Sequence, residues 1–261
     1  MAKVDFKLQD RVVVITGASQ GIGAACTERL SADGAAVALW DVADVPGNAL
    51  ARTLTEGDAR AAYFHCNVAS KAEVDAAVAA TLATFGRIDA LVNNAGIFKA
   101  ADFLEISEAD WDAVIDVNLK GAFLVGQAVA REMAKTGGGA IVNMSSVNGV
   151  MAIPNIASYN VSKGGINQLT RVMALALADK NIRVNAVAPG TIATELAQNA
   201  VLGSEEAKAG IMSRTPMKRL GTPEEIADVT AFLLSSASSY MTGEIVYVDG
   251  GRLTLNYTVP V

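Results

Sequence analysis

The feature that most constrains this chain is a series of short, nearly continuous apolar runs that alternate with longer alanine-rich segments. The seven runs are VVVIT (12–16), AVALW (36–40), AAYFH (61–65), DALVNN (89–94), GAIVNMS (139–145), IRVNAVA (182–188) and EIVYVDGG (244–251). Strands buried on both faces have such continuous sequences, and strands that alternate with helices pair in parallel. The sequence therefore predicts an α/β fold in a single domain over residues 1–261. We expect a doubly wound parallel sheet of about seven strands with helices on both faces.

Residues typical of helix ends bound two of the segments between the runs. Ser70, with Glu73 three residues later, predicts a capping box, and Gly86 predicts the end of that helix. The segment TPEE (222–225) predicts a second capping box with proline at the first helical position. Further helices are expected over 21–33, near 49, from about 107, and over 158–179.

Composition excludes several functional classes. The net charge is −6, and no basic tract is present, which argues against a nucleic-acid partner. The first ten residues are polar and charged, unlike a signal peptide. The longest uncharged run, 136–162, contains Gly, Ser, Asn and Pro and does not resemble a membrane span. We therefore expect a cytoplasmic protein with a small-molecule substrate and no membrane partner.

Cysteine and histidine are too few for several kinds of site. Cys26 and Cys66 are far apart and match neither a disulfide framework nor a metal site. His65 is the single histidine, so a histidine-rich metal site is excluded, and no metal is expected. A Ser-His-Asp triad would depend on His65, which ends a run expected to be a buried strand. The sequence therefore disfavours that triad.

A glycine-rich segment, TGASQGIGAAC (16–26), follows the first apolar run. Gly17, Gly21 and Gly23 lie between the expected strand and the expected helix. Glycines let a ligand approach the backbone, and the N–H groups at a helix N-terminus bind phosphate. The segment predicts a pyrophosphate site. A tight turn without a ligand remains the alternative, because the spacing differs from the usual G-x-G-x-x-G.

An acidic residue ends the second run. Asp41 follows Gly23 by 18 residues, where a carboxylate can accept hydrogen bonds from a ribose diol. The same carboxylate would repel a ribose 2′-phosphate, and the loop carries Gln20 rather than an arginine before Gly21. Both features favour NAD over NADP. A role for Asp41 as a strand-end cap remains the alternative.

A second group of polar residues has the spacing of a catalytic centre. Tyr159 and Lys163 are four residues apart, hence on one face of a helix, where the ammonium can stabilise a phenolate. Ser146 precedes Tyr159 by 13 residues, and its hydroxyl can hold a substrate oxygen. The segment NNAG (93–96) ends the fourth run, and Asn118 lies inside an expected helix, where asparagine has no propensity advantage.

Taken together, TGASQGIG, NNAG, Asn118, Ser146, YNVSK and PGTIAT resemble the short-chain dehydrogenase/reductase family, in its compact single-domain branch, from about Gln9 to Gly251. The resemblance implies a Rossmann fold and an NAD(P)-dependent oxidoreductase. The implied reaction interconverts a secondary alcohol and a ketone, or a sugar hemiacetal and a lactone, by hydride transfer. The resemblance also implies a homotetramer.

The resemblance assigns a role to each motif. It makes Tyr159 the general acid/base and Lys163 the residue that lowers the pKa of Tyr159 and binds the nicotinamide ribose. It makes Ser146 the residue that orients the alcohol or carbonyl, in preference to Ser145. Asn118 is expected to hold a water that connects Lys163 to solvent. The implied cofactor residues are Gly17, Ser19, Gln20, Gly21, Ile22, Gly23, Asp41, Asn67, Val68, Asn94, Ala95, Gly96, Tyr159, Lys163, Pro189, Gly190, Ile192 and Thr194. Asn67 stands where the family usually has aspartate.

The substrate is less constrained than the cofactor. The expected substrate residues are Ser146, Asn148, Asn155, Tyr159 and Thr191. Two asparagines suit a sugar, a polyol or a small hydroxy ketone, although Asn148 alone would also suit a loop cap. The alternative is a 3-oxoacyl thioester or a bulky hydrophobic ketone, in a pocket lined by Met151, Ile153 and Ile156.

Other classes of protein remain as alternatives. A non-catalytic NAD-binding sensor is disfavoured by the intact Asn-Ser-Tyr-Lys set. Sugar-nucleotide epimerases and dehydratases usually have a different glycine spacing and a longer chain. Residues 191–219 are expected to form a substrate lid, and the apolar tail 252–261 is expected to dock on its own subunit or on a neighbour.

Overall fold

The computed structural model describes residues 4–195 and 205–256. In this part of the chain, parallel strands form one seven-stranded sheet in the order β3-β2-β1-β4-β5-β6-β7. The strands are β1 (Val12–Thr16), β2 (Ala36–Asp41), β3 (Ala61–His65), β4 (Ala90–Asn93), β5 (Gly139–Met144), β6 (Ile182–Pro189) and β7 (Ile245–Val248). The predicted doubly wound parallel sheet is confirmed. The strand order reverses between β1 and β4, where open α/β sheets bind ligands beyond the carboxyl ends of their strands.

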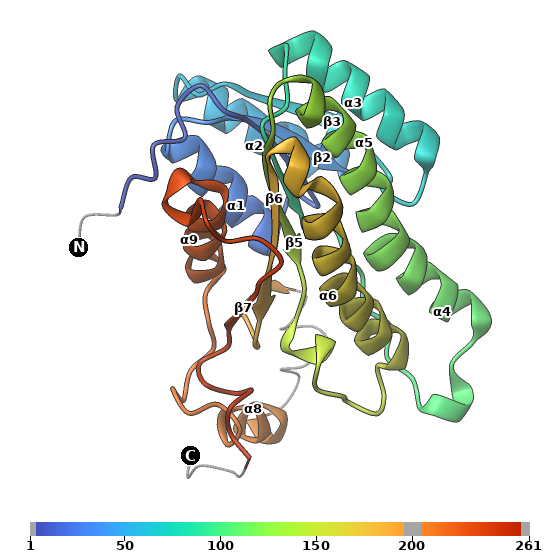
Figure 1. Cartoon of the computed structure of the whole chain (residues 1–261). Helices are drawn as coiled ribbons and strands as arrows, with labels where there is room; N and C mark the ends of the chain where they lie inside the picture. Colours follow the sequence, from blue (N-terminus) through green and yellow to red (C-terminus); the bar gives the residue numbers. More distant parts are fainter. Residues whose placement is uncertain (1–3, 196–204, 257–261) are drawn as a thin grey trace.

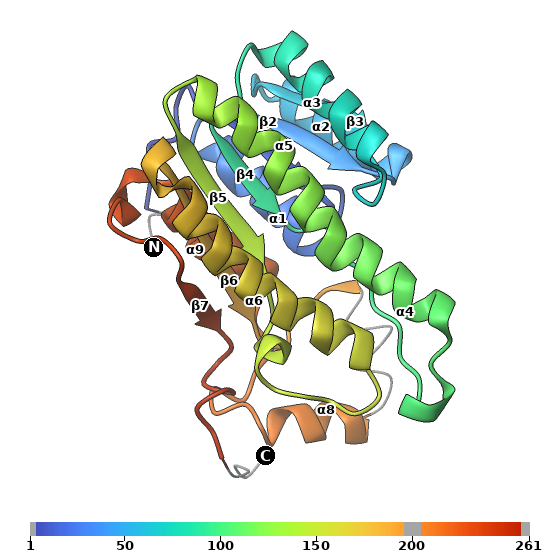
Figure 2. The same cartoon turned by 45° about the vertical axis from the view of Figure 1, so that its right-hand side comes forward.

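Helices cover both faces of the sheet (Figure 1). One face carries α1 (Gly21–Ala32), α2 (Asp44–Glu56) and α9 (Pro223–Leu234), and the other carries α3 (Lys71–Phe85), α5 (Gly121–Lys135) and α6 (Ala157–Leu177). The short α4 (Glu108–Ile115) continues into α5 through a π-helical turn, η2 (Asp116–Lys120). Figure 2 shows α8 (Glu205–Met212) beyond the carboxyl ends of the central strands.

The central strands are buried on both faces. Val13 and Ile15 of β1 point into the core beneath α1 and α9, whereas Val14 points into the core beneath α3 and α5. All three side chains are fully buried. Continuous apolar runs at these strands thus fill two cores, one on each side of the sheet.

The edge strand β3 differs from the expectation of a buried strand at His65. β3 pairs with β2 on one side only in the described part of the chain, and its residues are half-buried. The side chain of His65 is 52% exposed. The inference that His65 belongs to the buried interior is therefore wrong, because an apolar run does not distinguish an edge strand from a central one.

Of the two predicted capping boxes, one is complete and one is half-formed. At α9, Thr222 accepts from the Glu225 backbone, and the Glu225 carboxylate accepts from the Thr222 backbone. At α3, Ser70 accepts from the Glu73 backbone, but the Glu73 carboxylate accepts from the backbone N–H of Asn67 at 2.8 Å. The second half of the Ser70 box is therefore wrong, because the turn before α3 offers Glu73 a different donor.

One continuous helical stretch in the described part of the chain, 108–135, has the length and hydropathy of a membrane span. Half of its most apolar window is buried inside the molecule. Val125, Val129 and Met133 of this stretch are fully buried against the sheet. Core helices meet the same criteria of length and hydropathy.

Candidate active site

The glycine loop joins β1 to α1 with little space between its own segments. Gly17 and Gly21 have φ of +61° and +53°, which side chains rarely adopt. A Cβ on Gly23 would lie 1.9 Å from the Gly17 carbonyl oxygen. The close approach that the three glycines permit is thus partly an approach of the loop to its own helix. A Cβ on Gly21 would lie 3.4 Å from the Thr194 methyl group.

The N-terminus of α1 has the properties of a phosphate site. Gln20, the N-cap, is exposed and gives no side-chain hydrogen bond to the helix, and no acidic residue lies in the first turn, which begins at Gly21 and half-buried Ile22. The hydroxyl of Ser19 beside it is buried without a hydrogen-bond partner. Open N–H groups and an unpartnered hydroxyl suit a dinucleotide pyrophosphate. The residues present therefore fit the cofactor that the sequence implies.

Asp41 links the end of β2 to the glycine loop. Its Oδ2 accepts from the Ser19 backbone at 2.9 Å, and its Oδ1 accepts from the Ala43 backbone at 3.1 Å. The Asp41 side chain therefore caps the turn after β2 as well as facing the loop, so both sequence-based readings have support.

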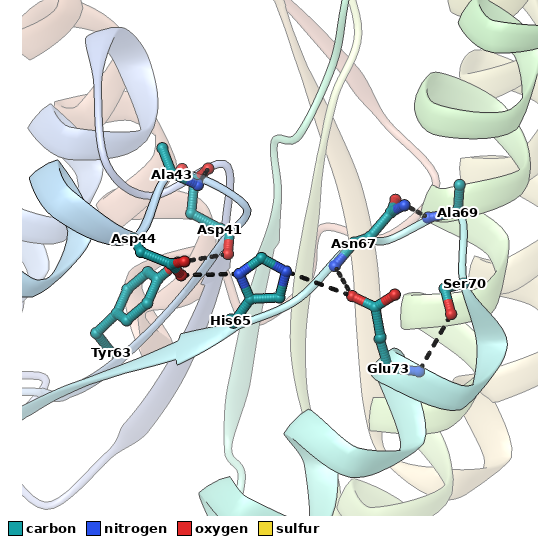
Figure 3. Close-up of polar contacts among 9 residues, drawn as sticks. All are labelled: Asp41, Ala43, Asp44, Tyr63, His65, Asn67, Ala69, Ser70 and Glu73. Atoms are coloured by element: carbon teal, nitrogen blue, oxygen red, sulfur yellow. Dashed lines mark hydrogen bonds and ion pairs between the residues drawn. The ribbon is translucent and has the colours of Figure 1, made fainter.

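The turn after β3 carries the two residues expected at the adenine. Asn67 is exposed, and its side-chain oxygen accepts from the Ala69 backbone at 3.0 Å (Figure 3). Val68 is buried, and it lies where a Cβ on Gly121 of α5 would meet it at 2.8 Å. An amide oxygen at position 67 makes the turn that an aspartate would also make.

Asn94 connects the end of β4 to the glycine loop. Its side-chain nitrogen donates to the carbonyls of Thr16 and Gly17 at 3.0 and 3.1 Å. In return, the Thr16 hydroxyl accepts from the backbones of Asn94 and Ala95 at 2.9 and 3.0 Å. The sequence analysis missed Thr16, although a threonine at the end of an apolar run and directly before a glycine is a usable signal.

Ser146, Tyr159 and Lys163 come together beyond the end of β5. Ser146 begins a 3-10 turn, η3 (Val147–Gly149), and its hydroxyl is hydrogen-bonded with Tyr159. Lys163 lies 5.5 Å from the centroid of the Tyr159 ring and donates to the Met144 carbonyl at 2.8 Å. The first two turns of α6 thus bring the three predicted residues into one group.

The electrostatics of this group differ in one respect from the expectation. Burial raises the pKa of Tyr159 above its ordinary value, and the hydrogen bond with Ser146 opposes that rise. Burial also lowers the pKa of Lys163 to about 8. The expectation that Lys163 lowers the pKa of Tyr159 is therefore wrong for the chain by itself, because desolvation of both groups outweighs their mutual effect.

Phe98 and Ser145 complete the surroundings of Tyr159. The Phe98 ring packs edge-on against Tyr159, with centroids 5.7 Å apart. Ser145 points elsewhere: its hydroxyl donates to Asn167 at 2.6 Å. Ser146 rather than Ser145 thus lies beside Tyr159, as the interval of 13 residues predicts. Phe98 gave no signal in the sequence beyond its place after NNAG.

Asn118 lies in the π-helical turn η2 and is buried. Its Oδ1 accepts from the Ile97 backbone at 2.7 Å, and its Nδ2 donates to the Ile97 carbonyl and to Ser162. The side chain thus fixes the segment after Gly96 to η2. Its two donor hydrogens are both used, so the predicted water relay would depend on the remaining acceptor capacity and on the backbone.

Residues expected at the substrate have different surroundings. The Asn148 backbone donates to the Ser146 hydroxyl at 3.1 Å, and the Asn148 Oδ1 is buried without a partner. Asn155 is exposed, and its carbonyl accepts from the Ala101 backbone. Thr191 lines a small cavity with Met217 and Arg219.

The segment after β6 forms part of that cavity. Pro189 ends β6, and the Gly190 backbone donates to Val248 of β7. Ile192 is buried and pairs in parallel with Gly221. The predicted lid 191–219 includes residues 196–204, which lie outside the described residues, as do 257–261 of the predicted tail.

Comparisons with known proteins agree with this geometry. Residues 17–252 match the family model described as Enoyl-(Acyl carrier protein) reductase. The chain is 41% identical to the 3-oxoacyl-[acyl-carrier-protein] reductase FabG of Thermotoga maritima, over 94% of this chain and 99% of that protein. It is 39% identical to the D-threitol dehydrogenase of Mycolicibacterium smegmatis, over 95% of this chain and 94% of that protein.

A solved structure has the same fold. The gluconate 5-dehydrogenase of Burkholderia cenocepacia, in complex with NADP and tartrate, superposes with a TM-score of 0.92 at 37% identity, over 96% of this chain and 98% of that one. The match extends from the glycine loop through the Ser-Tyr-Lys group to the end of β7. The chain therefore belongs to the short-chain dehydrogenase/reductase family and is an NAD(P)-dependent oxidoreductase acting on hydroxyl and keto groups.

Proposed function

We propose that this enzyme is an NAD-preferring dehydrogenase of a sugar, a polyol or a small hydroxy ketone, working in the cytoplasm. The observation that carries the substrate class is the buried, unpartnered Oδ1 of Asn148, two residues beyond Ser146. A buried acceptor without a donor is unfavourable, and a substrate hydroxyl would supply that donor. The relatives that act on D-threitol and gluconate support the same class.

The cofactor would lie along the carboxyl ends of β1, β2 and β4. The open N-terminus of α1 and Ser19 would hold its pyrophosphate, and Asp41 its adenosine ribose. Asn94, Ala95 and Gly96 would line its middle, and the segment 189–194 its nicotinamide end. When bound, the nicotinamide accepts or supplies the hydride.

Proton transfer is the task of the residues around Tyr159. In oxidation, the Tyr159 oxygen takes the proton of the substrate hydroxyl, and in reduction it returns that proton to the carbonyl oxygen. Ser146, already hydrogen-bonded with Tyr159, would hold the same substrate oxygen. Lys163 would keep positive charge near the phenolate, and the cofactor's own positive charge in oxidation would add to it. Phe98 would keep the ring of Tyr159 in place.

The preference for NAD is proposed from Asp41, whose carboxylate would repel a 2′-phosphate. The NADP complex of the Burkholderia cenocepacia enzyme shows that related chains also bind the phosphorylated cofactor. Replacing Asp41 by alanine should therefore erode the preference. An unchanged ratio of the two affinities would overturn this role.

The alternative substrate is a 3-oxoacyl thioester, as the name of the Thermotoga maritima relative indicates. A screen of absorbance at 340 nm with NAD or NADP, against sugars, polyols, simple secondary alcohols and 3-hydroxyacyl thioesters, separates the two. Turnover on hydroxylated carbon skeletons supports the proposal, and turnover only on thioesters or hydrophobic alcohols overturns the substrate class.

Asn148→Leu tests the substrate contact directly. The leucine removes the amide oxygen but keeps a similar volume, so polyol turnover should fall about 10- to 100-fold in kcat/KM, the effect of one lost hydrogen bond of about 1.5–3 kcal/mol. Turnover of simple aliphatic alcohols should change less. A uniform loss on all alcohols would mean that Asn148 only shapes the η3 turn.

A further inference from the structure

His65 stands beside the proposed adenosine site, between two helices. In the β2–β3 pairing, His65 lies opposite Asp41, and the Cys66 backbone donates to the Asp41 carbonyl at 2.9 Å. Figure 3 shows the imidazole between the carboxylates of Asp44 and Glu73. The one histidine of the chain is thus directly adjacent to the residue proposed to hold the ribose.

The contacts of His65 tie together the first turns of α2 and α3. Its Nδ1 lies 2.8 Å from Asp44 Oδ1, and its Nε2 lies 3.7 Å from Glu73 Oε2. Asp44 also accepts from the Tyr63 hydroxyl, and that hydroxyl contacts the Asp41 carbonyl at 2.7 Å. The position of the turn after β2 therefore depends on a network that includes His65.

The charges around this network are mostly negative. Carboxylates reach His65 from β2 (Asp41), α2 (Asp44) and α3 (Glu73), and each acts to raise the pKa of His65 above its ordinary value. The groups of β3 on either side stay neutral, because burial raises the pKa of Tyr63 and raises the pKa of Cys66 to about 12. His65 is accordingly the group of this cluster that changes charge near neutral pH.

We propose that His65 determines cofactor specificity in a pH-dependent way: its imidazolium offsets the acidic cluster and admits a ribose 2′-phosphate, and its neutral form leaves the carboxylates to exclude one. NADP adds a doubly charged group where NAD has a hydroxyl, so the charge of His65 matters more for NADP. Discrimination against NADP therefore increases as pH rises through the His65 pKa. The inference rests on the proposed function, in which Asp41 binds the ribose.

The test measures binding rather than turnover, so it does not require the substrate. The dissociation constants of NADH and NADPH are measured by nicotinamide fluorescence at pH 6 and pH 9 for the wild type and His65→Gln. At pH 6 the ratio Kd(NADPH)/Kd(NADH) should be about three- to tenfold higher in His65→Gln, the effect of one charge at about 8 Å with partial screening. At pH 9 the two proteins should have the same ratio. Because each comparison is made at one pH, the titration of the 2′-phosphate cancels.

Two further variants make the comparison specific. Lys71→Gln removes a positive charge from the same turn of α3, where Lys71 is paired with Asp75, and should match the wild type at both pH values. His65→Arg carries a permanent charge and should keep the low ratio at pH 9. Equal ratios for wild type and His65→Gln at pH 6, or the same difference at both pH values, would overturn the proposal.

A second readout uses the fact that the chain has one histidine. Reciprocal linkage requires that a ligand bound more tightly at low pH raises the pKa of the responsible group. The NMR titration of the single imidazole should therefore give a higher pKa in the NADPH complex than in the NADH complex. Identical values would overturn the inference. If Asp41→Ala leaves the cofactor ratio unchanged, the ribose assignment itself has failed instead.

Discussion

Tyr159 and Lys163 are the residues whose chemistry depends most on burial. Both are withdrawn from water, so the neutral form of each is favoured relative to its free side chain. Lys163 retains a hydrogen bond to the Met144 carbonyl, and Tyr159 retains one with Ser146. At the scale of single residues, the site holds its proton donor and its ammonium in reach of each other, but close to their neutral forms.

Tyr159→Phe should remove the proposed proton transfer without altering the packing. The phenylalanine keeps the contact with the Phe98 ring, so NAD affinity should stay within about twofold. Turnover should fall about 10²- to 10⁴-fold, the usual contribution of general acid–base catalysis. Steady-state kinetics and calorimetric NAD binding check the two parts. Near-wild-type turnover in the variant would exclude Tyr159 as the acid/base.

Lys163 should make stability depend on pH in an unusual range. Its pKa is lowered to about 8 in the folded protein and is about 10.4 in an unfolded chain. Between these values the unfolded state binds more protons, so folding becomes more favourable as pH rises, by about 1–3 kcal/mol. Urea unfolding of the wild type and Lys163→Met at pH 7.5 and pH 10 tests this. The wild type should gain on the variant at pH 10, and parallel curves would contradict the buried lysine.

At the scale of elements, the turn between β1 and α1 is held by contacts from three strands. Asn94 from the end of β4 bonds the carbonyls of Thr16 and Gly17, and Asp41 from the end of β2 bonds the Ser19 backbone. These contacts leave the N-terminus of α1 open and fix its direction. The glycine at position 23 lets the helix come against the loop without a side chain between them.

Gly23→Ala should therefore disturb the whole element. The added methyl group would lie 1.9 Å from the Gly17 carbonyl, so the loop must move, with a loss of about 1–3 kcal/mol in stability and a large loss of NAD affinity. Gly210→Ala on α8 is the matched control, because nothing lies within 4 Å of its Cβ. Thermal unfolding and calorimetry measure both effects. Equal behaviour of the two variants would mean that the loop tolerates a side chain.

At the scale of the whole molecule, one helical face carries exposed apolar side chains. Phe123 of α5 and Val161, Val172 and Leu175 of α6 are between 45% and 83% exposed on the single chain. A group of this kind on neighbouring helices is typical of an interface between subunits. It supports the proposed homotetramer, in which α5 and α6 would pack against their copies.

Light scattering at micromolar concentration should accordingly give a particle of about four times the 27.0 kDa chain. Leu175→Glu places a charge on the most exposed of these side chains and should shift the particle towards smaller species. Asp179→Lys, also exposed and on the turn that follows α6, is the control for a charge change. A wild-type particle of 27 kDa would contradict the assembly.

The sequence by itself determined the sheet, the glycine loop and the Ser-Tyr-Lys group. Continuous apolar runs require burial on both faces, glycines at fixed positions require a tight turn, and a spacing of four residues requires one helix face. These are local rules, so they hold before any tertiary contact is known. The position of Ser146 beside Tyr159, rather than Ser145, also followed from spacing.

Only the tertiary structure decided which side chains meet across the sheet. Thr16 is opposite Asn94 because β1 pairs with β4, and His65 is beside Asp41 because β3 is an edge strand paired with β2. Glu73 left its capping box for the Asn67 backbone because the turn before α3 brings that donor close. Strand order and burial arise from long-range packing, which sets both the pKa of Lys163 and the exposure of His65, and neither is encoded in a run of neighbouring residues.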